Sequence, residues 1–300
     1  MFERLYIALM KQLRPYDRQG AQLWQSHCKL RKEILAYYHD HPSTDPAIVQ
    51  ALDYLKGRLD TVFFPAPFRE KYEYRHIYLG FDEDHTPYWD MEEGKRLYFL
   101  PDSPDKVRRD LNGLRIEQDE ESAHRYLTPS FNLGEDDVLA DVGCAEGILT
   151  LQHIEKIRHA YLFESDPAWI SVLEKTFKPW KEKVTIVKGY VSDKDEGDHL
   201  RLDTYFKREG TTPTFVKLDV EGHEMSAING MEGLLDGGLP MKVAACTYHL
   251  QDEYSQLLDY VQKKGYSYET SRGVMLFGLY DTPKPPYFRH GLIRFKNQQA

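Results

Sequence analysis

Apolar residues recur at helical spacing through the first sixty positions of the chain. Within Gln22–Tyr38 they repeat every three or four residues, as in a helix with one buried face. A further helix is predicted from Pro46, because Asp45 is a favourable N-cap and proline suits the first helical turn. The stripe within Phe2–Leu13 predicts an earlier helix that contributes to a core or to an oligomer contact. Residues 1–60 are therefore predicted to be a helical region, and its helices are candidates for a homo-oligomer interface.

The pattern changes after residue 60, where prolines and aromatic residues become dense. His76–Phe81 and Arg96–Leu100 have the character of short strands with turn-forming residues between them. We interpret residues 61–128 as a β-containing cap or lid region that precedes the main domain and covers a substrate pocket.

From about Asp136 short apolar runs alternate with helical segments, beginning with Val138–Val142 and then Gly147–Ile157. This alternation predicts a mostly parallel sheet covered by helices on both faces. The runs Tyr266–Thr270 and Val274–Leu279 flank a Ser-Arg-Gly turn, so we expect a terminal hairpin and an antiparallel edge. We place this α/β domain at residues 129–300.

A glycine-containing turn, Asp141-Val-Gly-Cys-Ala-Glu-Gly147, follows the first strand of this domain. Glycines let the backbone approach a ligand closely, and the helix that follows directs free N–H groups at it. The turn lacks the third glycine of a dinucleotide fingerprint, and its leading carboxylate would repel a pyrophosphate but could hold an ammonium group. S-adenosylmethionine has an ammonium, a carboxylate and a sulfonium but no phosphate, so the turn favours it over NAD. We expect its methionine part at four residues: Asp141, Gly143, Ala145 and Gly147.

An acidic residue ends the second strand. Glu164 lies 23 residues after Asp141, and an acid at about that distance accepts hydrogen bonds from ribose hydroxyls. The third strand leads to Ser192, where we expect the chain to border the adenine. Together with the turn, these residues predict an S-adenosylmethionine site.

Composition disfavours several classes of function. The formal charge is −9 and no stripe of lysine and arginine offsets it, so we expect no nucleic-acid partner. No apolar run approaches the roughly 20 residues that cross a bilayer, and the first residues lack the apolar core of a signal peptide. The 3 cysteines share no spacing, which argues against a disulfide framework or a zinc cluster. We therefore expect a cytoplasmic protein without a membrane span.

The chain from about Ala123 onward resembles the FkbM family of S-adenosylmethionine-dependent methyltransferases. The resemblance rests on Asp141–Gly147, on Phe163-Glu-Ser-Asp-Pro167, and above all on Phe215-Val-Lys-Leu-Asp-Val-Glu-Gly-His-Glu224. It implies a class I methyltransferase (Rossmann-like) fold with a mostly parallel seven-stranded sheet and one antiparallel strand, preceded here by the helical and β-containing extension. It also implies O-methylation of a hydroxyl on a sugar, glycan precursor or secondary metabolite, with a small molecule or glycan as acceptor.

Candidate catalytic residues follow the later strands, because open α/β sheets bind ligands beyond the carboxyl ends of their strands. His249 is the best candidate base, since imidazole titrates near neutrality, while Asp219 and Glu221 could orient the acceptor hydroxyl or take its proton. Alternatively, Mg²⁺ or Mn²⁺ could be held by Asp219, Glu221, His249 and Glu253. The residues alone leave base and metal undecided.

Two other functions stay open at this point. A non-catalytic module could bind the cofactor or a partner on the same fold. An NAD-dependent oxidoreductase is the other alternative, and the missing third glycine disfavours it.

Overall fold

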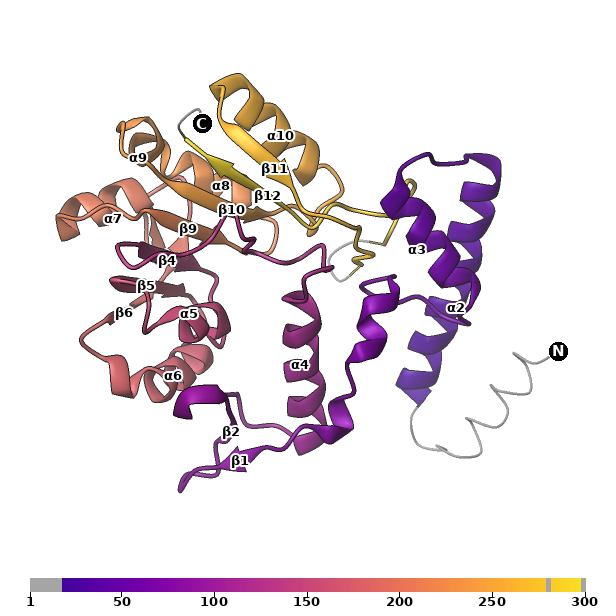
Figure 1. The fold of residues 1–300 in the computed structure, drawn as a ribbon, viewed down its shortest axis with the longest axis horizontal. Helices are drawn as coiled ribbons and strands as arrows, with labels where there is room; N and C mark the ends of the chain where they lie inside the picture. Colours follow the sequence, from indigo (N-terminus) through magenta and orange to yellow (C-terminus); the bar gives the residue numbers. More distant parts are fainter. Residues whose placement is uncertain (1–17, 279–281, 298–300) are drawn as a thin grey trace.

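A seven-stranded sheet forms the centre of the protein in a computed structural model that describes residues 18–278 and 282–297 (Figure 1). Its strands lie in the order β11-β12-β10-β9-β4-β5-β6. Their bounds are β4 Val138–Val142, β5 His159–Glu164, β6 Val184–Lys188, β9 Phe215–Leu218, β10 Lys242–Cys246, β11 Ser267–Thr270 and β12 Leu292–Lys296. The neighbours from β10 to β6 are parallel, whereas β12 is antiparallel to both β10 and β11. The expected mostly parallel sheet with antiparallel pairing at one edge is confirmed.

The antiparallel edge does not arise from the expected hairpin. Strand β11 pairs with β12, with Thr270 opposite Ile293, so more than twenty residues separate the two strands in sequence. The described part of the second run, residues 274–278, forms no named strand, although Met275 makes an isolated bridge with Arg289. The predicted Tyr266–Thr270 and Val274–Leu279 hairpin is wrong, because the chain leaves the sheet after β11 and returns only at β12.

Helices cover both faces of the sheet, as the alternation of strands and helices predicts. Their bounds are α5 Ile148–His153, α6 Pro167–Thr176, α7 Leu202–Glu209, α8 Glu224–Asn229, α9 Glu232–Asp236 and α10 Glu253–Lys264, with a short helix η4 at Lys178–Trp180 and a small two-stranded sheet of β7 Tyr190–Val191 and β8 His199–Leu200. The side chains of β4 alternate between two buried clusters, with Leu139 in one and Ala140 in the other. The core therefore consists of two layers on opposite faces of the sheet.

The N-terminal helices lie beside the α/β domain rather than over its sheet (Figure 1). Helix α2 spans Arg18–Asp40 and α3 spans Pro46–Lys56; the Asp45 carboxylate caps α3 by accepting a hydrogen bond from the backbone N–H of Ala47 at 2.8 Å. The pair buries residues such as Leu55 against Phe288 and its neighbours. The predicted stripe within Phe2–Leu13 lies outside the described residues, and the oligomer contact stays a prediction. None of the described helices is long and apolar enough to cross a membrane.

Residues 61–128 contain a small antiparallel sheet and one long helix. The bounds are η1 Pro67–Lys71, η2 Tyr74–His76, β1 Gly80–Phe81, β2 Pro87–Asp90, η3 Glu92–Gly94, β3 Arg96–Tyr98 and α4 Pro104–Glu117. A strand over the whole of His76–Phe81 is wrong, since only its last two residues pair. The sheet is fixed to α6, where the Lys175 ammonium donates to Asp82 at 2.6 Å and to Asp84 at 2.8 Å. The boundaries at residues 60 and 128 and the role of this region as a lid stay predictions.

Candidate functional site

A cavity of about 900 Å³ opens at the carboxyl ends of β4, β5 and β9. Strand β4 has β5 on one side and β9 on the other, so this is the point where the strand order reverses and where such sheets bind ligands. Four of the six predicted cofactor residues line the cavity, namely Gly143, Ala145, Glu164 and Ser192. The exceptions, Asp141 and Gly147, are not among its lining residues.

The turn after β4 requires its two glycines for different reasons. Gly143 has a φ of +70°, and a Cβ atom there would lie 2.0 Å from the backbone oxygen of Asp219. Gly147 has a φ of +79°, and its Cβ would meet the ring of Phe177 at 2.8 Å. Gly143 therefore allows the turn to approach β9 beside the cavity, whereas Gly147 lets the start of α5 pack on α6.

Glu164 ties the end of β5 to this turn. One carboxylate oxygen accepts from the backbone N–H of Ala145 at 3.0 Å. The other accepts from the N–H groups of Ser165 at 2.7 Å and Asp166 at 2.9 Å. The carboxylate thus lines the cavity in a fixed orientation, and its contact with a ribose stays a prediction.

Asp141 has a protein cation as its partner. Strands β4 and β9 place Asp141 directly opposite Lys217, and the carboxylate oxygen Oδ1 lies 3.3 Å from the ammonium Nζ. Thr150 donates to the other carboxylate oxygen at 2.8 Å, and Lys217 also donates to the backbone oxygen of Gly143 at 2.6 Å. Burial alone lowers the pKa of Lys217, but the charges of Asp141 and Asp219 outweigh it and hold that pKa above its ordinary value. Asp141 therefore supports the turn through Lys217, and it does not line the cavity in which we expected it to hold an ammonium group.

Asp219, just after β9, is the centre of a hydrogen-bond network. Tyr126 donates to Oδ2 at 2.7 Å and Tyr248 donates to Oδ1 at 3.3 Å. The Nε2 atoms of His124 and His249 lie 3.4 Å and 3.3 Å from the same two oxygens. Burial raises the pKa of Asp219, but the histidine hydrogen bonds and the charge of Lys217 outweigh it, so the pKa lies well below its usual range.

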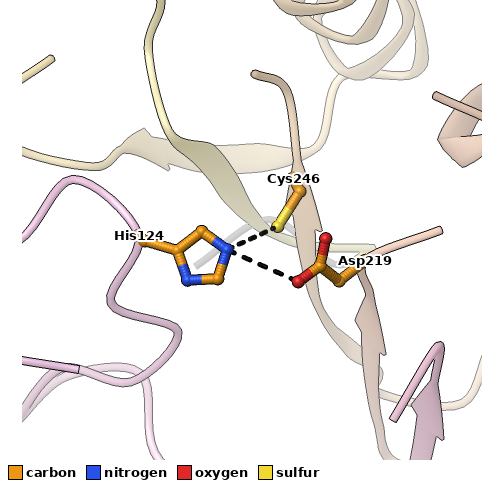
Figure 2. Close-up of side chains that lie close together, drawn as sticks. All are labelled: His124, Asp219 and Cys246. Carbon is orange, nitrogen blue, oxygen red and sulfur yellow. Dashed lines mark hydrogen bonds and ion pairs between the residues drawn. The ribbon is translucent and has the colours of Figure 1, made fainter. Parts of the chain in front are cut away.

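Sequence reasoning did not predict that His124 and Cys246 lie together beside Asp219. Figure 2 shows that His124 Nε2 faces both Asp219 and the Cys246 sulfur, which lies 3.6 Å away. Burial raises the pKa of Cys246 well above its ordinary value, so this side chain is a thiol. His124 precedes the whole α/β sheet in sequence, and its proximity to Asp219 follows only from the fold.

His249 lies between two carboxylates. Its Nδ1 is 3.0 Å from Glu224 and its Nε2 is 3.3 Å from Asp219. Burial lowers the pKa of His249, but hydrogen bonds to Asp219 and Glu224 outweigh burial and raise the pKa to about 10. The ring is therefore an imidazolium at neutral pH, and it must lose a proton before it can act as the base that the sequence predicted.

The predicted metal ligands do not converge as a set. Among the described residues, Asp219 and His249 have ligand atoms close together with Glu224, and not with Glu221 or Glu253. A metal ion at His249 would have to displace a ring proton that Asp219 and Glu224 stabilise, and the oxygens of Asp219 already face four donors. Burial and the neighbouring Glu224 raise the pKa of Glu253 to about 8, which favours its neutral form. These side chains do not fit Mg²⁺ or Mn²⁺ in this arrangement.

A second cavity, of about 450 Å³, adjoins the first. Both are lined by Gly143, Ala145, Asp219 and Glu221. The rest of the second cavity is lined mainly by aromatic side chains, with a few charged and small residues, as follows: Phe63, Phe64, Arg69, Gly113, Ile116, Glu117, Tyr248, His249 and Phe277. Two compartments that meet at a carboxylate are suited to passing a group from a molecule in one to a molecule in the other.

A sequence model of the Methyltransferase FkbM domain matches residues 76–268, well over half of the chain. The protein belongs to the FkbM methyltransferase family. The expected resemblance is thereby confirmed, and the sheet order described above agrees with the expected class I methyltransferase fold. The matched residues include the whole lining of the first cavity but leave out Phe63, Phe64, Arg69 and Phe277 of the second.

Several solved structures are similar to this chain at low identity. The methyltransferase FkbM from Methylobacillus flagellatus KT is 17% identical, with a TM-score of 0.44 over 65% of this chain and 56% of that chain. Precorrin-8w decarboxylase from Methanobacterium thermoautotrophicum is 17% identical, with a TM-score of 0.38 over 56% of this chain and 84% of that one. TrmK of M. capricolum, solved with S-adenosylhomocysteine, is 11% identical, with a TM-score of 0.37 over 58% and 70% of the two chains. The match thus spans little more than half of the M. flagellatus protein. No curated protein matches the chain.

Proposed function

We propose that this protein is an S-adenosylmethionine-dependent O-methyltransferase that acts on a hydroxyl of a sugar, glycan precursor or secondary metabolite. The observation that carries the proposal is the meeting of the two cavities at Asp219 and Glu221, directly beside the glycine turn. Membership of the FkbM family supports methyl transfer. The non-catalytic and NAD-dependent alternatives have no comparable observation in their favour.

The first cavity is proposed to hold S-adenosylmethionine, which supplies an electrophilic methyl group. Gly143 and Ala145 border its methionine part, Glu164 accepts hydrogen bonds from the ribose, and Ser192 lies at the adenine. Asp141 and Lys217 act on this site indirectly, because Lys217 fixes the backbone oxygen of Gly143. Gly147 acts through the packing of α5.

Asp219 is proposed to orient the acceptor hydroxyl and to accept its proton as the oxygen attacks the methyl carbon in line. Its lowered pKa makes it a weak base, so its main contribution is placement of the hydroxyl. His249 keeps the carboxylate in position and balances its charge. Glu221 lines both cavities and is exposed, so it is the second candidate for the proton.

Calorimetric titration with S-adenosylhomocysteine, with NAD run in parallel, tests the cofactor. We expect saturable binding of S-adenosylhomocysteine alone; binding of NAD alone would overturn the proposal in favour of the oxidoreductase. Transfer of a labelled methyl group to a panel of hydroxylated acceptors, with and without a chelator, then tests the reaction. Asp219→Asn should abolish transfer while Glu221→Gln retains part of it, and the reverse order would move the proton to Glu221.

A further inference from the structure

Arg69 is a half-buried arginine on the wall of the second cavity. It lies in the short helix η1, and no side chain or backbone group of the described residues forms an ion pair or hydrogen bond with its guanidinium. Two other half-buried arginines do have such partners: Arg58 pairs with Asp60 at 3.2 Å and Arg108 donates to a backbone oxygen at 3.0 Å. A partly desolvated guanidinium gains most from a bidentate anion such as a carboxylate or phosphate.

The second cavity is lined by both acidic and basic side chains. Two of its carboxylates, those of Asp219 and Glu221, belong to residues that it shares with the first cavity, whereas Arg69 lines only the second. Glu117 also lines the second cavity, but burial raises the pKa of its carboxyl group and so disfavours its negative charge. His249 adds a second positive charge to this cavity. An anion that avoids the shared carboxylates therefore finds a favourable partner in Arg69.

Aromatic rings form much of the remaining wall. The ring of Phe63 lies 5.4 Å from that of Phe277 and 5.9 Å from that of Tyr248, in edge-to-face contacts. Such a wall packs well against a flat or apolar group of a ligand, and it lowers the local dielectric constant around Arg69. The combination of apolar walls with one unpaired cation is typical of sites for organic anions.

We propose that Arg69 determines acceptor specificity by binding an anionic group, a carboxylate or phosphate, on an acceptor with an apolar or ring-shaped body. The hydroxyl to be methylated then reaches Asp219 at the shared edge of the two cavities. This inference rests on the proposed function, because it assigns the second cavity to the acceptor.

Small aromatic probes test this subsite in the full chain saturated with S-adenosylhomocysteine. Benzoate carries a carboxylate, phenyl phosphate carries a phosphate, and benzamide is the neutral analogue of benzoate. In ligand-observed NMR titrations we expect at least one anion to bind ten times more tightly than benzamide. Whichever anion binds more tightly identifies the group that Arg69 prefers.

Variants then assign the preference to Arg69. Arg69→Gln should reduce anion affinity to the level of benzamide, and Arg69→Lys should retain part of it. The matched control is Arg75→Gln, since the Arg75 side chain is 70% exposed and pairs with Glu73 outside the cavity, and it should bind the probes as the wild type does. Equal affinity of the wild type for benzoate and benzamide, or unchanged anion affinity in Arg69→Gln, would overturn the inference.

S-adenosylhomocysteine binding separates this inference from the proposed function. If the wild type and Arg69→Gln both bind S-adenosylhomocysteine equally, the variant is folded and any loss of anion binding belongs to the subsite. If S-adenosylhomocysteine does not bind the wild type, the proposed function fails first.

Discussion

Replacing Lys217 with methionine removes the buried ammonium that faces Asp141 across β9 and β4. Methionine keeps the unbranched shape of the side chain but carries no charge and donates no hydrogen bond. The Asp141 carboxylate, in a residue that is 1% exposed, then keeps only the hydrogen bond from Thr150. The substitution therefore leaves a charge in the core without its main partner.

The size of the effect follows from the separation of the charges. At 3.3 Å and an effective dielectric constant of about 20, the attraction between the two charges is about 5 kcal/mol. Breaking a buried ion pair by removing one partner destabilises proteins by roughly 3–5 kcal/mol. We expect Lys217→Met to lower the free energy of unfolding by about 3–5 kcal/mol. It should also weaken S-adenosylhomocysteine binding, because Gly143 loses its hydrogen bond from Lys217.

Urea denaturation followed by circular dichroism measures the change in unfolding free energy at pH 7. The m-value, which is the slope of this free energy against urea concentration, should be the same in both proteins if the unfolded state is unchanged. Lys263→Met is the matched control, since Lys263 is exposed on α10, and it should change stability by less than about 0.5 kcal/mol. Asp141→Asn and the double variant complete a cycle, in which the double variant should lose much less than the sum of the single losses. Losses that add to within about 0.5 kcal/mol would refute the coupling of the two side chains.

Three further predictions concern single residues. Burial raises the pKa of Glu146 to about 8 from 4.5, so its contribution to stability is full below pH 4.5 and is lost as the pH rises through 8. The wild type should therefore lose up to about 5 kcal/mol more unfolding free energy than Glu146→Gln between pH 5 and 9, as measured by urea titrations. The same loss in both proteins would contradict the effect of burial on Glu146. Gly143→Ala should abolish S-adenosylhomocysteine binding in calorimetry, because its Cβ would lie 2.0 Å from a backbone oxygen, whereas Gly210→Ala, with a φ of +65° but open space around it, should bind normally. His249→Ala should slow methyl transfer at least tenfold (about 1.4 kcal/mol) while changing S-adenosylhomocysteine affinity less than threefold, and equal losses in both would argue against its placement at the acceptor.

The cofactor cavity could be predicted from short stretches of sequence. Gly143, Ala145 and Glu164 reach one cavity because each lies at or just after the carboxyl end of a strand of the same parallel sheet, and these ends share an edge. That relation needs only the order of strands along the chain. The role of Asp141 could not be predicted in this way, because its partner Lys217 is set by the register between β4 and β9.

The charges of the residues that line the second cavity depend on contacts between residues far apart in sequence, and a short sequence pattern does not predict such contacts. His249 is a candidate base by residue type, but its charge is set by Asp219 and Glu224, which come from other parts of the sequence. The hairpin after β11 was predicted from adjacent apolar runs, whereas the true partner of β11 is β12, farther along the chain. Helix α4 was not predicted, although Ser103 followed by Pro104 is a recognisable N-terminal signal.

The residues that line the two cavities come from partly different segments of the sequence. All residues of the first lie within the segment shared by the FkbM family, while Phe63 and Arg69 precede that segment and Phe277 follows it. Substitutions in these flanking stretches alter the second cavity without touching the glycine turn or Glu164. A variant library confined to these flanking positions would therefore vary the acceptor cavity while leaving every residue that lines the donor cavity as it is.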